Sequence, residues 1–260
     1  MEMFGLLILQ LAVLACSASE LGRIVGGEPT SIEKYPIIVQ VEFLVDSSIW
    51  TQNCAGSVLT SRTILSAAHC YVGPSYSPRE RRIRAGSSYR YTGGTIKNVA
   101  LSLNHPTFGL NDYDGDIALL FLEDRLVYSN VIAQAAIASS TFVVPDNSSV
   151  THIGWGMVSL PGNRSEVLRE VDVLSVNNDL CRERYKTANP PRVVTPNMIC
   201  AGILDVGGKG ACFGDSGGPL LYSDVVVGIV AFGEGCADAT APGVNTLVSP
   251  YTNWIVENAN

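Results

Sequence analysis

Short apolar segments separated by turn-forming residues run through most of this chain. Those with the length and composition of β-strands span 37–43, 63–67, 81–85, 95–101, 117–122, 170–175 and 225–232. Clusters of Gly, Pro, Asn and Ser separate them, and no helical segments alternate with them. Because a parallel α/β sheet needs that alternation, the pattern predicts an all-β sandwich or a pair of barrels.

Only two short helices are predicted. One closes the chain, where Ser249 can cap the first turn, Pro250 suits that turn, and residues 254–256 supply an apolar side. The other begins at residue 177 or 178 and runs to about residue 184. Helices are therefore expected at the edges of the fold and not between its strands.

Length and composition fit one large domain or two small ones. The chain has 260 residues, 47% of them apolar and 16% charged, which is enough to bury a core without depending on disulfides. Its formal charge of -7 argues against nucleic acid and anionic membranes as partners. The loop at 139–149 predicts a boundary between a first unit, 24–138, and a second, 139–260.

The first 18 residues have the pattern of a secretory signal peptide. An apolar run ends in small side chains and is too short to span a bilayer. Glu2 stands where a basic residue is usual, and the alternative is a buried first helix. A signal at 1–18 predicts a secreted, extracellular protein, in which Asn147 and Asn163 begin candidate glycosylation sequons.

Six cysteines remain once the signal, with Cys16, is removed. An even number in an exported chain predicts three disulfides, each worth about 3 kcal/mol. Six cysteines allow 15 pairings, among which these considerations do not choose. The residues concerned are Cys54, Cys70, Cys181, Cys200, Cys212 and Cys236.

The segment 208–220, GKGACFGDSGGPL, has five glycines in thirteen residues. Such density lets backbone N–H groups converge, either as a phosphate cradle or as an oxyanion hole. A P-loop needs a lysine followed by Ser or Thr, whereas Lys209 precedes Gly210. Ser216, between Asp215 and two glycines, is instead typical of an exposed nucleophile, which requires a histidine base and an orienting carboxylate.

The chain has three histidines from which to choose the base. His69 follows an apolar strand and adjoins a cysteine, whereas His105 and His152 are interpreted as ordinary core histidines. Within the acidic cluster 112–116, only Asp116 leads directly into an apolar strand. An isolated aspartate there is usually a turn or cap residue, but a buried one needs a partner, which His69 supplies.

Several motifs occur together: SAAHC, DIALL, GWG and GDSGGP, with IVGG at 24–27. In order and spacing they resemble the trypsin and chymotrypsin family, from residue 24 to the final helix, and most closely its insect digestive enzymes. The resemblance implies two antiparallel six-stranded β-barrels and a C-terminal helix, with the active site between the barrels. It also implies the disulfides Cys54–Cys70, Cys181–Cys200 and Cys212–Cys236.

The same resemblance implies a mechanism. Ser216 attacks the scissile carbonyl, His69 takes and returns the proton, and Asp116 orients the imidazole, as in the general template of this family. Backbone N–H groups of Gly214 and Ser216 form the oxyanion hole. No metal and no cofactor is expected.

Two further features follow from the resemblance. Cleavage after Arg23 is expected to activate a zymogen by freeing the Ile24 ammonium, which pairs with Asp215. The family usually has a serine that donates to the triad aspartate where this chain has Ala231. Asp116 is therefore expected to have one donor fewer.

The substrate pocket is expected to be uncharged. Trypsin-like relatives have an aspartate six residues before the nucleophile, where this chain has Gly210. Burying a large apolar side chain in such a pocket is worth about 1.5–3 kcal/mol, which predicts chymotrypsin-like specificity and hence a separate trypsin-like activating protease. Glu234 is the alternative, a rim carboxylate that recruits basic side chains. The other expected pocket residues are Ala211, Ala231, Phe232, Gly233 and Gly243.

The predicted function is therefore a secreted, monomeric serine endopeptidase, with digestion in a gut lumen as its expected setting. Its expected partners are protein or peptide substrates and protein protease inhibitors. A non-catalytic homologue that only binds proteins is the contrasting hypothesis. A small-molecule esterase is disfavoured because the chain lacks the GxSxG nucleophile elbow.

Overall fold

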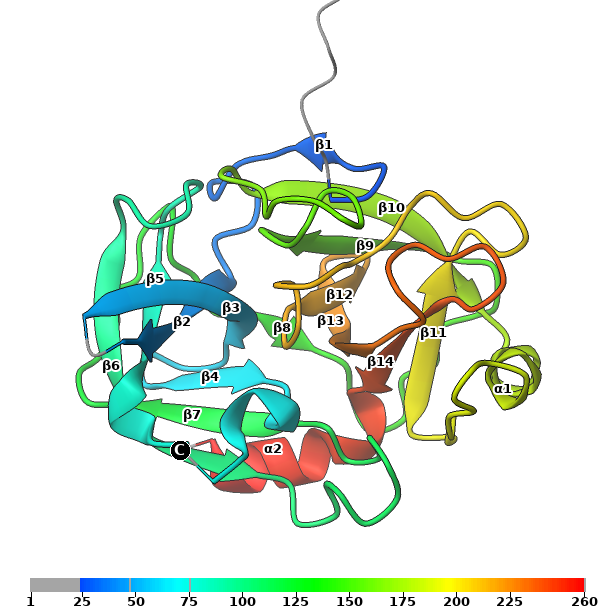
Figure 1. The fold of residues 1–260 in the computed structure, drawn as a ribbon. Helices are drawn as coiled ribbons and strands as arrows, with labels where there is room; N and C mark the ends of the chain where they lie inside the picture. Colours follow the sequence, from blue (N-terminus) through cyan, green and yellow to red (C-terminus); the bar gives the residue numbers. More distant parts are fainter. Residues whose placement is uncertain (1–23, 47, 75, 260) are drawn as a thin grey trace, which may run out of the picture.

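The computed structural model describes residues 24–46, 48–74 and 76–259. The expected signal peptide at 1–18 and propeptide at 19–23 lie outside these residues. Strands account for most of the regular structure and form two closed barrels, which lie side by side in Figure 1. The predicted all-β class is confirmed, as is its division into two six-stranded antiparallel barrels.

The first barrel closes in the order β2-β3-β4-β7-β6-β5, and every neighbouring pair is antiparallel. It is drawn in blue to green on the left of Figure 1. Its strands are β2 (Ile38–Val45), β3 (Ile49–Val58), β4 (Thr63–Ser66), β5 (Arg81–Ala85), β6 (Thr95–Asn104) and β7 (Ala118–Leu122).

The second barrel has the order β10-β11-β14-β13-β12-β9, and an additional antiparallel pairing of β9 with β10 closes the ring. Its strands are β9 (Ser149–Gly154), β10 (Arg169–Val176), β11 (Met198–Gly202), β12 (Pro219–Tyr222), β13 (Val225–Phe232) and β14 (Gly243–Leu247). Two short strands join it from the predicted first unit, 24–138: β1 (Glu28–Pro29) pairs with β10, and β8 (Ala136–Ile137) pairs in parallel with β13.

Both predicted helices are present. Helix α1 (Asn178–Lys186) begins where Asn177 Oδ1 accepts two backbone N–H groups, and α2 (Thr252–Asn258) closes the chain. The prediction that Ser249 caps the final helix is wrong: Ser249 lies in the 3-10 turn η3 (Ser249–Tyr251), and no side chain caps α2. Two further 3-10 turns are η1 (Ala68–Tyr71) and η2 (Pro78–Glu80).

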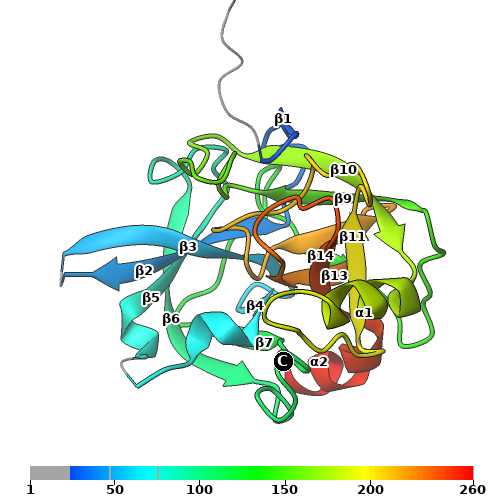
Figure 2. The same cartoon turned by 45° about the vertical axis from the view of Figure 1, so that its right-hand side comes forward.

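The C-terminal helix returns to the first barrel. Figure 1 shows α2 below β7, Figure 2 shows it beside β7 at the bottom of the molecule, and the Thr63 hydroxyl donates to the Ala259 carbonyl at 2.8 Å. Because β1 and β8 pair with strands of the second barrel, each predicted unit contributes structure to the other. The division at residue 138 therefore remains a proposal.

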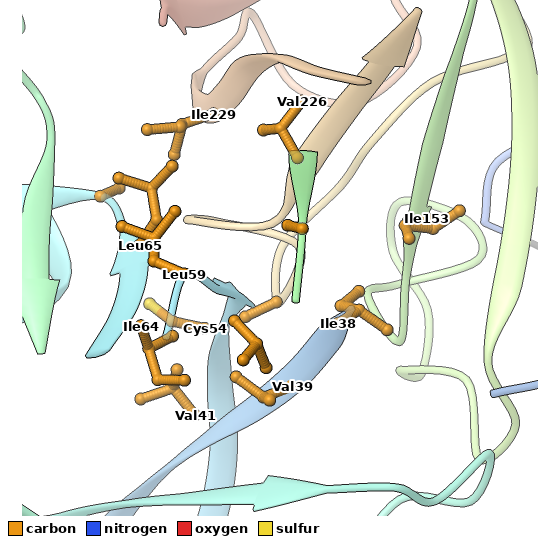
Figure 3. Packing of buried hydrophobic residues seen from close by; sticks show 14 of the residues in the cluster. Ile38, Val39, Val41, Cys54, Leu59, Ile64, Leu65, Ile153, Val226 and Ile229 are labelled. Carbon is orange, nitrogen blue, oxygen red and sulfur yellow. The ribbon is translucent and has the colours of Figure 1, made fainter. Parts of the chain in front are cut away.

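One hydrophobic cluster spans both barrels. Figure 3 shows buried side chains from β2 and β4 of the first barrel beside Val226 and Ile229 of β13 and Ile153 of β9. All of these side chains are almost fully buried. Continuous apolar packing of this kind holds the two barrels in a fixed relation, which a site formed between them requires.

Three disulfides are present, and they are the pairs that the resemblance implies. Cys54–Cys70 joins β3 to η1, Cys181–Cys200 joins α1 to β11, and Cys212–Cys236 joins the segment before β12 to the loop after β13. Their sequence separations are 16, 19 and 24 residues. Within the described residues, no helix is long and apolar enough to cross a membrane.

Candidate active site

A cleft of about 520 Å³ runs between the barrels. His69 and Tyr113 line it from the first barrel, and Ser216 lines it from the second. The three residues predicted to carry the chemistry are thus brought to one place from segments far apart in the sequence: His69 and Ser216 line the cleft, and Asp116 lies directly behind His69.

His69 is held by Asp116 at two points. The ring Nδ1 lies 2.7 Å from Asp116 Oδ2, and the His69 backbone N–H donates to Oδ1 at 2.8 Å. Asp116 is 0% exposed, so its carboxylate requires such partners. Because a carboxylate only accepts, Nδ1 must carry the hydrogen, which leaves Nε2 as the basic nitrogen.

Local structure explains this placement. Strand β4 ends at Ser66, the chain turns into η1, and the Cys54–Cys70 disulfide fixes the residue that follows His69. Asp116 stands just before β7, the strand paired with β4. Adjacent antiparallel strands therefore present both residues at the same edge of the barrel.

The Asp116 carboxylate receives only the two His69 hydrogen bonds within the described chain. Thr246 donates to the backbone carbonyl of Asp116 at 2.8 Å and not to its carboxylate. Ala231, which is buried and lines the cleft, has no hydroxyl to offer. The geometry is consistent with the missing third donor expected from the sequence.

Ser216 is partly buried in a turn that depends on glycine. Gly214 and Gly217 have φ of 106° and 78°, and a side chain on Gly217 would collide with Ser66 and the backbone of Ala55. Among the described residues, none accepts a hydrogen bond from the N–H of Gly214 or of Ser216. No hydrogen bond joins Ser216 Oγ to His69 within the described chain. Two neighbouring N–H groups are thus available to an oxyanion.

Asp215 is buried beside this turn. Its carboxylate accepts from the N–H of Gly156 at 2.7 Å and of Cys212 at 3.0 Å, and burial raises its pKa to about 6. Side chains on Gly154 or Gly156 would collide with that carboxylate, which explains the glycines of the GWG motif. A buried carboxylate with only neutral donors is a site for a cation.

The N-terminal end of the described chain lies next to this region. Ile24 is fully buried, and the Gly210 N–H donates to the Val25 carbonyl at 3.1 Å. Gly26 has φ of 70° and lies against the Gly208 carbonyl, where no side chain fits. The segment 24–27 therefore packs on the loop that precedes Ser216.

The expected pocket residues mostly line the cleft. Ala211, Ala231, Phe232, Gly233 and Gly243 are among its walls, whereas Gly210 is not. Gly210 is buried behind the lining, where a side chain would contact Ala237. The charged residues that line the cleft, within the described chain, are Arg164, Arg192 and Glu234.

Several lining residues carry no sequence signal. The Arg192 guanidinium lies 5.0 Å from the Tyr113 ring and 4.9 Å from the Phe232 ring, so it joins one residue from each barrel. His152 and Asn245 line the inner end of the cleft, although His152 is interpreted from the sequence as an ordinary core residue. Only the pairing of the strands brings His152 and Asn245 to the cleft.

Few of the described side chains in this site could bind a metal ion. The one cluster of three candidate ligands within the described residues is Cys54, His69 and Cys70. The two sulfurs are joined in a disulfide, and a metal needs thiolates. His69 Nδ1 is also committed to Asp116.

Comparison with known proteins agrees with this geometry. The family model described as Trypsin matches residues 24–255. The chain is 41% identical to "Trypsin, alkaline C" of Manduca sexta and 40% identical to "Trypsin CFT-1" of Choristoneura fumiferana, in each case over 255 residues and 98% of both chains. It is 36% identical over 236 residues to "Vitellin-degrading protease" of Bombyx mori, covering 91% of this chain and 85% of that protein.

Two antiparallel barrels with a cleft between them that brings together a serine, a histidine and an aspartate define a serine endopeptidase. The chain belongs to the trypsin family. Its substrates are therefore proteins or peptides.

Proposed function

We propose that this chain hydrolyses peptide bonds through an acyl-enzyme formed on Ser216. The observation that carries the proposal is the pair of hydrogen bonds by which Asp116 holds His69 in the cleft that Ser216 also lines. Ser216 Oγ attacks the scissile carbonyl and passes its proton to His69 Nε2, which then protonates the leaving amine. Water repeats the sequence to release the acid.

The oxyanion of each tetrahedral intermediate lies against the N–H groups of Gly214 and Ser216. One such donor is worth about 3–4 kcal/mol of barrier in serine proteases. Neither group has an acceptor among the described residues, so neither must break a hydrogen bond to serve.

The proposed specificity is for large apolar side chains before the scissile bond. Small or apolar residues dominate the walls, and Gly210 supplies no carboxylate behind them. The names of the relatives, which are trypsins, argue instead for basic side chains, and Glu234 at the cleft is the group that would bind them. Arg164 and Arg192 line the same cleft and oppose a basic substrate there.

Peptide anilides that differ only in a final Phe, Leu, Arg or Glu distinguish these two candidates. We expect kcat/KM for Phe to exceed that for Arg by about a hundredfold, because a buried guanidinium would find no counter-charge. Ser216→Ala is the control for contaminating protease, and Glu234→Gln should leave the Phe rate unchanged. Preference for Arg that Glu234→Gln abolishes would establish the basic candidate, and absence of Ser216-dependent hydrolysis would establish a non-catalytic homologue.

Ala231→Ser is expected to raise kcat about fivefold with little change in KM. The new hydroxyl can donate to the Asp116 carboxylate, and one such hydrogen bond is worth about 1 kcal/mol. Steady-state kinetics on the best anilide measures the effect. Ala231→Cys is the matched control, because cysteine has nearly the size of serine but is a weak donor; an equal gain with cysteine would contradict the hydrogen-bond explanation.

The proposal also covers where the enzyme acts and how it is activated. The three disulfides fit an oxidising, extracellular compartment, and Asn147 and Asn163 are exposed, as glycosylation requires. The chain is proposed to act as a monomer on dietary protein in a gut lumen, to be bound by protein protease inhibitors, and to be activated by a trypsin-like protease that cuts after Arg23. Arg23 lies outside the described residues.

A further inference from the structure

The inner end of the cleft contains two buried polar side chains with unused hydrogen-bonding atoms. His152 on β9 is 2% exposed, Asn245 on β14 is 1% exposed, and both line the cleft. Within the described residues, His152 Nδ1 and Asn245 Oδ1 have no hydrogen-bond partner. Leaving such an atom unpaired costs about 1–3 kcal/mol, which a ligand that pairs it recovers.

The two side chains face each other across the second barrel. Strands β9 and β14 are three strands apart in either direction around the ring. His152 is opposite Leu220, Leu220 is opposite Gly228, and Val230, two residues after Gly228, is opposite Asn245. Because paired residues share a face and alternate residues return to it, His152 and Asn245 both point into the barrel.

The route to them is lined by short or apolar residues. Ala211, Gly243, Val230 and Val244 line the cleft together with His152 and Asn245. Gly228 lets Asn245 approach Leu220, since a side chain on Gly228 would lie 3.2 Å from the Cβ of each. A substrate side chain that enters therefore passes apolar walls before it reaches polar atoms.

The chemistry of the inner end is neutral. Asn245 Nδ2 donates to the Ile199 carbonyl at 3.2 Å, which fixes the amide so that Oδ1 remains an acceptor. Burial lowers the pKa of His152 to about 4, so its ring is uncharged near neutral pH and Nδ1 either donates or accepts, depending on the tautomer. The pair can therefore meet one group that both donates and accepts.

We infer that His152 and Asn245 determine specificity by binding the hydroxyl of a substrate tyrosine at the bottom of the pocket. The aromatic ring fills the apolar passage, the phenol O–H donates to Asn245 Oδ1, and His152 Nδ1 binds the same oxygen. Phe, Leu and Met bring no donor, whereas Lys and Arg bring a charge to a neutral site. This inference rests on the proposed function, because it names which large side chain the pocket prefers.

Paired anilides that end in Tyr or Phe test the inference with the unaltered processed enzyme. We expect kcat/KM for Tyr to exceed that for Phe by about tenfold. Competitive inhibition by p-cresol should likewise be about tenfold tighter than by toluene, a comparison that needs no variant to fold. Equal values for Tyr and Phe, both above Arg, would overturn this inference alone, whereas preference for Arg over both would overturn the proposed pocket.

Variants then assign the effect to the two residues. Asn245→Leu, and separately His152→Leu, should bring the Tyr/Phe ratio close to one mainly by lowering the Tyr rate. His105→Leu is the matched control: that histidine packs on Tyr251 and Trp254, away from the cleft, and its loss should leave the ratio unchanged. A tenfold ratio that survives both cleft variants would overturn the assignment.

Discussion

Asp116→Asn is expected to lower kcat of the processed enzyme by about four orders of magnitude, the loss characteristic of this substitution in the Ser-His-Asp triads of the family. The carboxylate accepts both the backbone N–H and the ring Nδ1 of His69. An amide can accept only with its oxygen, so one of the two donors must face an N–H₂ group. Since the backbone N–H cannot change, the ring is driven to the tautomer that lacks a basic Nε2.

Stopped assays at high enzyme concentration, with active sites counted by a phosphonate label, measure this loss. Asp114→Asn is the matched control, because Asp114 lies two residues away and accepts from Thr195 and Asn197 instead of His69. It should retain nearly full activity. An Asp116→Asn enzyme within tenfold of the unaltered protein would remove His69 and Asp116 from the proposed mechanism.

Much of the fold is predictable because several strands alternate between buried and exposed residues, as β10 does, or are almost continuously buried, as β13 is. The segment 225–232, for example, coincides with β13. Strands β3, β9, β11, β12 and β14 fall outside the predicted segments. The sequence of β3, IWTQNCAGSV, gives no strand signal because it is rich in polar residues. Gln52 is buried there nonetheless, and its amide donates to the carbonyl of Cys54 in the same strand and to that of Gly214 in the second barrel. Polar residues that are satisfied only by tertiary contacts give no hydrophobic period to detect.

The residues of the candidate site likewise fall into two groups: those that the sequence indicates and those that only the fold brings to the cleft. His69, Asp116 and Ser216 stand in motifs whose residue types already indicate chemistry. His152 and Asn245 stand in ordinary strands, and their position at the cleft follows from strand order and register, which the sequence does not specify. Arg192 is likewise brought to Tyr113 only by the meeting of two loops from different barrels.

Arg23→Gln is expected to hold the protein in an uncut form with kcat/KM about 150- to 5000-fold below that of the processed enzyme. The buried Asp215 carboxylate has two neutral backbone donors. We propose that cleavage lets the freed Ile24 ammonium pair with it. Leaving a buried charge without its partner costs about 3–5 kcal/mol, which corresponds to that loss of rate. Arg23→Lys, which a trypsin-like activator still cuts, is the control that should regain full activity.

The proposed ion pair between the Ile24 ammonium and Asp215 also predicts how the free energy of unfolding depends on pH. In the uncut chain burial raises the pKa of Asp215 to about 6, so the folded state holds a proton that the unfolded chain, with an ordinary carboxyl, releases at lower pH. The protonated Asp215 carboxyl therefore stabilises the uncut fold fully below pH 4. This stabilisation is lost as the pH rises through 6, which lowers the free energy of unfolding by about 3 kcal/mol for a shift of this size. The freed ammonium favours the ionised carboxylate and should remove this loss.

Denaturant unfolding of Arg23→Gln and processed protein at pH 4.5 and 7.5 measures the difference, and Asp215→Asn should abolish it. Identical pH dependence in the cut and uncut forms would show that Ile24 does not reach Asp215, and the zymogen switch would have to be sought elsewhere.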